Sequence, residues 1–298
     1  MSIVATVPPR TVLADLLAAR GTAIMAHRGT PGVTVVENTA RAAITAVLSG
    51  ADIIELDVTG STDGAYFAFH DGEEKRLLGH DVHLLEMTAA EIRECAFTRV
   101  STVARAARIE TIEEILTGLW NRFPDTLVNL DRSWTHWPHF FSHLDRFDRA
   151  DQLILKSPVS GGHWQHLQHH PVKYPYVGIC RTVAEAEIAL AQTEVNVIGV
   201  ELLATSATSP FLDPVVLDAL RERGAILIAN AEVLIGGADL FAGHDDDEAL
   251  FGTGPGWSRL LNLGFDVIQT DWPWLLRHAI DAHHSTPRQG VPSPERQR

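Results

Sequence analysis

Four side chains near the start of the chain have the types and spacing that chemistry on a charged substrate needs. Glu55 and Asp57 lie two residues apart within the apolar run 53–58, and because a strand alternates its faces, both carboxylates point to one side. Two carboxylates buried together repel, and a divalent cation relieves that repulsion. Oxygen ligands alone favour Mg²⁺, Ca²⁺ or Mn²⁺. His27 and His70 flank this pair in the sequence, and histidine is the side chain most often used as a general acid or base.

Strands and helices must bring these groups together, and the sequence alternates between the two. Short apolar runs of the buried type predict strands at residues 23–27, 53–58, 127–131, 153–156, 176–180, 197–202, 225–230 and 266–270. The segments between them predict helices at residues 38–48, 89–95, 111–120, 137–147, 163–170, 183–192, 214–223 and 272–283, and a further extended piece at 66–70. Alternation of this kind implies a parallel sheet. Eight such units favour a (β/α)₈ TIM barrel, of class α/β, over an open doubly wound sheet.

A barrel places catalytic groups at the carboxyl ends of its strands, which gives this prediction a positional test. Polar residues do gather at or just after the predicted strand ends: His27, Glu55, Asp57, Asp131, Lys156, Glu201, Asn230 and Asp271. Strands generally become polar where they leave a core, and that explanation suffices for the last two residues. It does not explain three carboxylates that converge beside a histidine. We therefore expect Glu55, Asp57 and Asp131 to bind one cation.

The composition excludes several other classes of protein. The 298 residues carry 24 Lys and Arg against 38 Asp and Glu, a net charge of −14, which argues against nucleic acid as a partner and against docking on anionic membranes. No apolar run suits a membrane span, and the N-terminal residues lack a signal-peptide pattern. Cys95 and Cys180 lack metal-ligand spacing, so we expect free thiols in a reducing, cytoplasmic setting. The sequence does not indicate an oligomeric state.

The motifs in residues 27–71, taken together, resemble those of the glycerophosphodiester phosphodiesterase family, which is part of the phospholipase C-like phosphodiesterase superfamily. The resemblance rests on HRG at 27–29, ENT at 37–39, ExD at 55–57, TDG at 62–64 and HD at 70–71, with a later TDxP-like ending at 270–273. It implies a (β/α)₈ barrel with a small insertion after strand two, hydrolysis of a glycerophosphodiester-like P–O bond and a place in lipid metabolism. We accordingly expect one domain over residues 1–285, with 72–108 as the insertion, and a disordered tail at 286–298.

The resemblance also implies roles for particular residues. One divalent cation is expected on the ExD pair and on the acidic residue that ends strand three. Catalysis is expected from two histidines, and phosphate contact from the arginine of HRG. These roles fall on Glu55, Asp57 and Asp131 as cation ligands, His27 and His70 as catalytic residues, and Arg28 as the phosphate contact. We assign His27 as the base and His70 as the acid, and Glu37 as a helix N-terminal charge or a partner of another site residue.

Three positions depart from the family pattern. Val36 replaces the usual Pro, Asp131 replaces the commoner Glu, and Ser133 stands where the family often carries Lys. We predict that Lys156 reaches the phosphate from the next strand instead. Glu201 is then expected to contact the substrate's leaving group, either by accepting hydrogen bonds from a polyol or by pairing with a cationic head group beside the aromatic rings. The alternative is that Lys156 extends its ammonium to solvent and Glu201 pairs with an Arg.

The walls of the pocket and the route of the reaction each allow two interpretations. Trp134 and Trp272 flank strand ends and are either pocket walls that bind substrate or core residues. The nucleophile is either water or a hydroxyl of the substrate. The second route yields a cyclic phosphate, as in sphingomyelinase D-like enzymes. The rival functions are a non-catalytic barrel that binds a phosphodiester and a metal-dependent barrel hydrolase that acts on another kind of bond.

Overall fold

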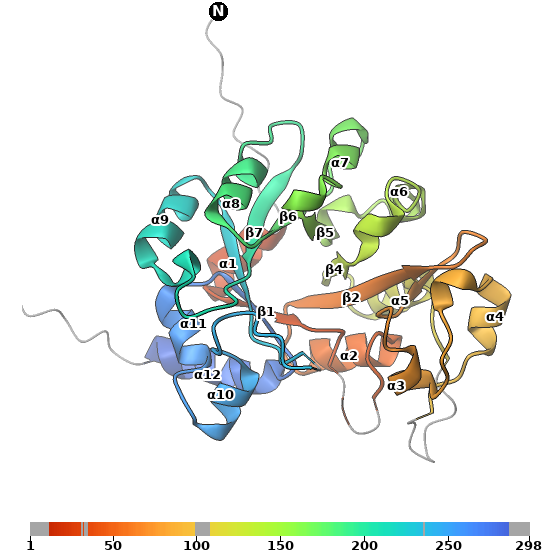
Figure 1. The fold of residues 1–298 in the computed structure, drawn as a ribbon, viewed down its shortest axis with the longest axis horizontal. Coiled ribbons are helices and arrows are strands. Elements are labelled where there is room, and N and C mark those ends of the chain that lie inside the picture. The colour runs from red at the N-terminus through yellow and green to blue at the C-terminus, as the bar shows by residue number, and fades with distance from the viewer. Residues whose placement is uncertain (1–11, 31, 33–34, 99–107, 235, 286–298) are drawn as a thin grey trace, which may run out of the picture.

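A closed barrel of parallel strands forms the centre of the protein (Figure 1). The computed structural model describes residues 12–30, 32, 35–98, 108–234 and 236–285. The eight barrel strands are β1 (Ala23–Ala26), β2 (Ile53–Gly60), β4 (Leu127–Asp131), β5 (Leu153–Pro158), β6 (Tyr176–Cys180), β7 (Val197–Leu202), β8 (Ile226–Asn230) and β9 (Val267–Thr270). Each strand pairs in parallel with the next, and β1 pairs with both β2 and β9, which closes the ring. The predicted (β/α)₈ fold is confirmed.

Helices surround this ring of strands (Figure 1). They are α1 (Val12–Arg20), α2 (Ala40–Leu48), α5 (Ile112–Arg122), α6 (Phe141–Leu144), α7 (Gln165–His169), α8 (Val183–Leu190), α9 (Pro214–Glu222), α10 (Asp246–Phe251), α11 (Trp257–Leu263) and α12 (Pro273–Ser285). A capping box between Thr111 and Glu114 opens α5. None of the helices that the structure describes combines the length and apolar character that crossing a bilayer needs.

The prediction of one helix over residues 137–147 is wrong in its first half. Trp137 has an extended backbone, because the ring of Pro138 disfavours the helical conformation of the residue before it. The regular helix α6 therefore begins at Phe141 and has only 4 residues, followed by a 3₁₀ turn over Asp145–Phe147. Helices α1, α10 and α11 were not predicted.

The segment between β2 and α5 folds beside the barrel (Figure 1). It contains β3 (Tyr66–Ala68), which pairs antiparallel with β2, then α3 (Glu74–Leu78), the 3₁₀ turn η1 (Leu84–Glu86) and α4 (Ala89–Glu94). A small apolar cluster of its own holds it together: Phe67, Phe69, Leu77, Leu78, Leu84, Ile92, Phe97 and Ile109. The predicted insertion over residues 72–108 stays a prediction, and residues 99–107 and the predicted tail at 286–298 lie outside the described residues.

The interior of the barrel changes from apolar to polar along its axis. Near the amino ends of the strands, one cluster includes Met25, Ile53, Leu127, Ile154, Ile228 and Val267. Because side chains alternate, the residue two positions further along each strand faces the same way. Those residues are His27, Glu55, Asn129, Lys156, Asn230 and Gln269. The fold thus seals one end with hydrophobic packing and presents polar groups at the other.

Candidate active site

Three carboxylates converge at the polar end of the barrel. Glu55 and Asp57 lie on β2, and Asp131 lies opposite Asp57 in the register with β4. One oxygen from each lies within 4.8 Å of the other two. Glu55 is fully buried and its Oε1 atom has no hydrogen-bond partner among the described residues. Burial and the charges of Asp57 and Asp131 raise the pKa of Glu55 well above its usual range. Three oxygen donors that repel one another, one of them unpartnered, fit a divalent cation.

Two residues with left-handed backbones hold these carboxylates in place. Arg28 has φ 52° and Asn38 has φ 55°. The Arg28 amide donates to Glu55 Oε2 at 2.6 Å. Asn38 binds Asp57 twice: its Nδ2 donates to Asp57 Oδ2 at 2.9 Å, and its Oδ1 accepts from the Asp57 amide at 2.9 Å. The HRG and ENT motifs therefore fix the ExD pair through these contacts.

The Arg28 guanidinium lies among carboxylates. Its Nη1 donates to Glu37 Oε1 at 2.6 Å, and its Nε lies 3.2 Å from Asp57 Oδ2. Arg76 also donates to Glu37 at 2.6 Å. Although burial opposes it, the hydrogen bonds from Arg76 and Arg28 lower the pKa of Glu37. Glu37 therefore acts as a partner of other site residues. Arg28 and His27 both line a cavity of about 90 Å³, and phosphate contact by Arg28 stays a prediction.

His27 is held by a residue from the far end of the chain. Its Nδ1 lies 2.9 Å from Asp271 Oδ1, so Nδ1–H donates and Nε2 remains for another partner. Burial lowers the pKa of His27, but the Asp271 hydrogen bond and the charges of Glu232, Asp271 and Glu55 outweigh it and raise that pKa to about 10. By its sequence position alone, Asp271 is an ordinary residue at a strand end. The TDxP-like ending was the signal that could have found it.

Asp246 fixes the backbone around Asp271. It is buried at the start of α10 and accepts hydrogen bonds from the Asp271 amide at 2.9 Å and from Thr270 Oγ1 and Trp257 Nε1, both at 2.7 Å. Glu232, which follows β8, is also buried and accepts from Gln269 Nε2 at 2.8 Å. Sequence reasoning missed both acids, because each lies in a loop without a pattern that marks it.

His70 follows β3, which pairs with β2. The Phe69 amide donates to the Asp57 carbonyl at 3.1 Å, so His70 directly follows a residue that is hydrogen-bonded to one of the three converging carboxylate residues. His70 Nδ1 donates to the Asp71 carbonyl at 2.8 Å. The Asp71 carboxylate in turn accepts from Arg132 Nε at 2.6 Å. The antiparallel pairing of β3 with β2 therefore places His70 close to Asp57 in the fold, and a catalytic role for His70 stays a prediction.

Lys156 lies inside the barrel with 1% of its surface exposed. Its Nζ is 2.8 Å from Asp131 Oδ2 and 2.9 Å from Glu201 Oε2, and Asn230 Nδ2 donates to the other Glu201 oxygen at 2.9 Å. Although burial opposes the charge, Asp131 and Glu201 raise the pKa of Lys156 well above its usual range. The alternative of a solvent-exposed Lys156 with Glu201 paired to an Arg is wrong.

Ser133 does not supply the positive charge that the family's Lys would bring to this position. It is fully buried, and its hydroxyl turns back to donate to the Leu130 carbonyl at 2.9 Å. It opens a 3₁₀ turn, η2 (Ser133–His136), that follows the left-handed Arg132. The ammonium nearest to Asp131 is therefore that of Lys156, on the neighbouring strand.

The two tryptophans predicted as pocket walls lie in different surroundings. Trp134 lines a cavity of about 320 Å³ at the mouth of the barrel, which we call the rim cavity. Its wall consists of Val58, Thr59, Asp71, Leu85, Arg132, Trp134, Thr135 and His136. Trp272 is 37% exposed, and its ring centroid lies 5.3 Å from that of Trp274. Substrate contact by either tryptophan stays a prediction.

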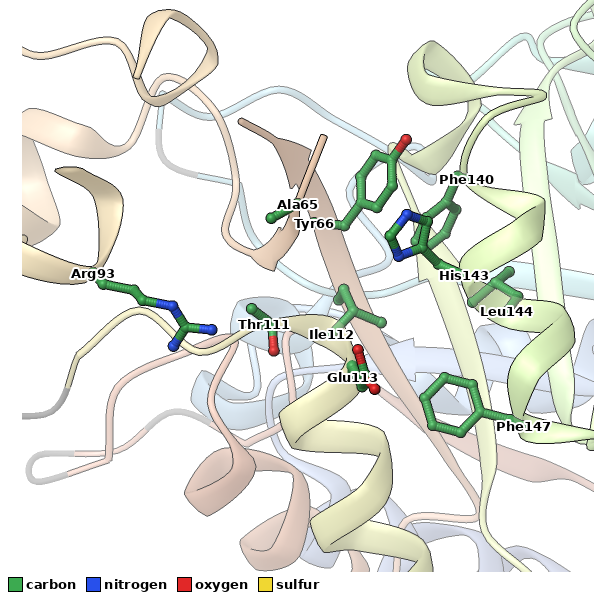
Figure 2. Close-up of a pocket in the computed structure, with 10 residues that line it drawn as sticks. All are labelled: Ala65, Tyr66, Arg93, Thr111, Ile112, Glu113, Phe140, His143, Leu144 and Phe147. Carbon is green, nitrogen blue, oxygen red and sulfur yellow. The ribbon is translucent and has the colours of Figure 1, made fainter. Parts of the chain in front are cut away.

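A second aromatic cavity, the outer cavity, lies between β3, α5 and α6 (Figure 2). It has a volume of about 170 Å³ and is lined by Ala65, Tyr66, Arg93, Thr111, Ile112, Glu113, Phe140, His143, Leu144 and Phe147. Figure 2 shows the rings of Tyr66 and His143 side by side in its wall, where they meet edge to face with centroids 4.8 Å apart. None of its lining residues is a predicted site residue.

Solved structures resemble this chain over nearly its whole length. A glycerophosphoryl diester phosphodiesterase from Parabacteroides distasonis superposes with a TM-score of 0.68 at 16% identity, covering 91% of this chain and 92% of its own. A glycerophosphodiester phosphodiesterase from Agrobacterium tumefaciens gives 0.61 at 20% identity, covering 86% and 99%. A phosphodiesterase from Oleispira antarctica, solved with the product sn-glycerol-3-phosphate, gives 0.62 at 17% identity, covering 87% and 96%. At these identities the likeness establishes the fold.

The sequence itself identifies the family. No curated protein sequence matches the chain, but a sequence profile of the glycerophosphoryl diester phosphodiesterase family matches residues 27–229. That range contains both histidines, the three converging carboxylates, Lys156 and Glu201. The non-catalytic barrel and the non-phosphate hydrolase are thereby set aside, and the chain belongs to the glycerophosphoryl diester phosphodiesterase family and is a phosphodiesterase.

Proposed function

We propose that this protein hydrolyses glycerophosphodiesters with one divalent cation and a pair of histidines. The observation that carries the proposal is the convergence of three carboxylates at the same barrel end as His27 and the buried Lys156. Glu55, Asp57 and Asp131 would hold the cation, since their oxygens lie close together and Glu55 keeps one oxygen unpartnered. When bound, the cation would offset negative charge on the phosphoryl oxygens.

The hydrogen bond to Asp271 supports a revised role for His27. With Nδ1–H bound to Asp271, a second proton would sit on Nε2 and be available to the substrate. Because its pKa is raised to about 10, His27 is protonated at neutral pH. A protonated imidazole donates to the leaving oxygen, so we assign His27 as the acid and His70 as the base, the reverse of the assignment from sequence.

Lys156 is proposed to bind the phosphoryl group from within the barrel. An ammonium has three N–H donors, and two of these are directed to Asp131 and Glu201. The third remains for a phosphoryl oxygen next to Asp131. Glu201, which also accepts a hydrogen bond from Asn230, then orients Lys156. This role accounts for the buried Glu201 carboxylate more directly than the contact with the substrate that was predicted from sequence.

Turnover of glycerophosphodiesters tests this function. The purified protein is incubated with glycerophosphoethanolamine after treatment with EDTA, and then with Mg²⁺, Ca²⁺ or Mn²⁺ restored singly. We expect activity to disappear with EDTA and to return with at least one cation. Full activity in EDTA would contradict the cation site.

The product identifies the nucleophile. In H₂¹⁸O, attack by water places ¹⁸O in glycerol phosphate, whereas attack by the neighbouring hydroxyl releases a cyclic phosphate without the label. We expect the labelled, open product. A cyclic product seen by ³¹P NMR would instead support the sphingomyelinase D-like route.

A further inference from the structure

We propose that the rim cavity binds one alcohol group of the phosphodiester, and that this group is an uncharged cyclic polyol of the class of hexoses and cyclitols. The inference rests on the proposed function, because it names the substrate class of that same site. It uses residues on β2, η1 and η2 that the acid–base chemistry does not involve.

The position of the rim cavity supports this use. Three of its wall residues directly follow predicted site residues along the chain: Val58 follows Asp57, Asp71 follows His70, and Arg132 follows Asp131. The Arg132 amide also donates to Asp131 Oδ1 at 2.6 Å. Thr59, another wall residue, lies on the same face of β2 as Asp57, so a phosphoryl group beside the three carboxylates would direct one alcohol substituent along β2 toward this cavity.

Thr59 supplies a buried hydroxyl that has no hydrogen-bond partner among the described residues. It lies two residues beyond Asp57 on the same face of β2, roughly 7 Å along the strand. Its side chain is 1% exposed, and its Oγ1 finds no hydrogen-bond partner in the part of the chain that the structure describes. A buried hydroxyl without a partner is unfavourable, and a hydroxyl both donates and accepts. A hydroxyl of the substrate satisfies it in either direction.

The remaining walls combine apolar surface with compensated charge. Trp134 and the half-exposed Leu85 offer apolar faces, whereas Arg132 and Asp71 pair at 2.6 Å. Burial lowers the pKa of His136, which keeps that ring neutral. Because these charges cancel, the cavity does not favour a cationic or anionic head group. An apolar wall beside several donors and acceptors fits a ring with a CH face and hydroxyl edges.

The size of the cavity agrees with this substrate class. Its volume of about 320 Å³ exceeds what a glycerol group fills, and it falls at the lower end of the range of about 300–1,000 Å³ seen for small-molecule sites. His136 closes the cavity against Gly60, where a Cβ atom would lie 2.9 Å from its ring. The absence of that Cβ lets η2 lie directly on β2 and sets the width of the cavity.

Substrate preference tests the proposal. The ratio of kcat/KM for glycerophosphoinositol to that for glycerophosphocholine is measured with the activating cation present. We expect a ratio of about ten or more in the wild type. Thr59→Val, which keeps the shape and removes the hydroxyl, should lower the ratio about tenfold, since a site built to bind a hydroxyl discriminates through it. Trp134→Ala should lower it as well.

A matched control comes from the outer cavity (Figure 2). His143→Ala changes an aromatic wall that does not adjoin the carboxylates, and it should leave both the ratio and the activity as in the wild type. Thermal unfolding of each variant shows whether it folds. If Trp134→Ala does not fold, the nearly isosteric Thr59→Val still tests the proposal.

The possible failures are distinguishable. If the wild type cleaves glycerophosphodiesters but shows equal kcat/KM for inositol, choline, ethanolamine and glycerol groups, the rim-cavity proposal alone is wrong. It is also wrong if Thr59→Val slows all four substrates equally. If no glycerophosphodiester is cleaved with any of the three cations, the proposed function fails, and the substrate class fails with it.

Discussion

Two sides of the same barrel end handle charge in opposite ways. On the β2 side, Glu55 and Asp57 are buried next to each other with Asp131 nearby, and one carboxylate oxygen is unpartnered among the described residues. On the β5–β7 side, Lys156 lies between Asp131 and Glu201, so each charge there faces an opposite one. The first side is suited to accept a cation. The second is already compensated and is suited to hold an ammonium in a fixed place.

The largest effect is expected on the β2 side, where three converging carboxylates outnumber the one guanidinium, that of Arg28, that lies 3.2 Å from Asp57. Asp57→Asn removes a ligand charge at nearly constant shape, and it should lower kcat/KM about a thousandfold or more, because the cation contributes several kcal/mol to transition-state stabilisation. Calorimetric titration with Mg²⁺ should show a matching loss of affinity. The matched variant is Glu201→Gln, which removes a carboxylate charge on the compensated side, next to Lys156. Equal losses of cation affinity in both variants would contradict the distinction between the two sides.

The histidines come next in expected effect. His27→Ala and His70→Ala should each reduce kcat on an alkyl diester about a hundredfold or more, as is usual for general acids and bases. The two variants separate on an aryl phosphodiester, whose good leaving group needs little protonation. His27→Ala should regain most of its rate there and His70→Ala should not. Recovery by His70→Ala instead would restore the assignment made from sequence.

On the compensated side, Lys156→Met should cost both activity and stability. Glu201 would remain buried without its cationic partner, and only the Asn230 hydrogen bond would be left to it, which lowers the free energy of unfolding by about 3–5 kcal/mol. The rate should fall about ten- to a hundredfold. The double variant Lys156→Met/Glu201→Leu removes the orphaned charge and should recover much of the stability in urea unfolding. If it recovers the rate as well, Lys156 has no role in phosphate binding.

The smallest effect is a shift in pH dependence. If His27 is the acid, activity falls as the pH rises through its pKa, which is raised to about 10 in the structure. Asp271→Asn removes the charge and the strong hydrogen bond that raise this pKa, so the alkaline limb of kcat/KM should move to lower pH by about one to three units. If the alkaline limb does not move, a group other than His27 determines it.

The sequence by itself determined the carboxylate side. Alternation along one strand places Glu55 and Asp57 on the same face, and the regular succession of apolar runs predicts the barrel that brings in Asp131. These are local patterns, and the structure reproduces their convergence. The capping box at Thr111 was equally readable, because it depends only on residues three apart.

Only the tertiary structure determines which side chains the site residues pair with. His27 and Asp271 are 244 residues apart and meet only because β1 pairs with β9 when the barrel closes. The partners of Lys156 depend on strand register and on its burial, neither of which appears in the residue types around it. Thr59 directly follows the predicted strand 53–58, and no pattern in the sequence marks it. Only the tertiary packing around β2 buries its hydroxyl without a partner among the described residues, in a residue that lines the rim cavity.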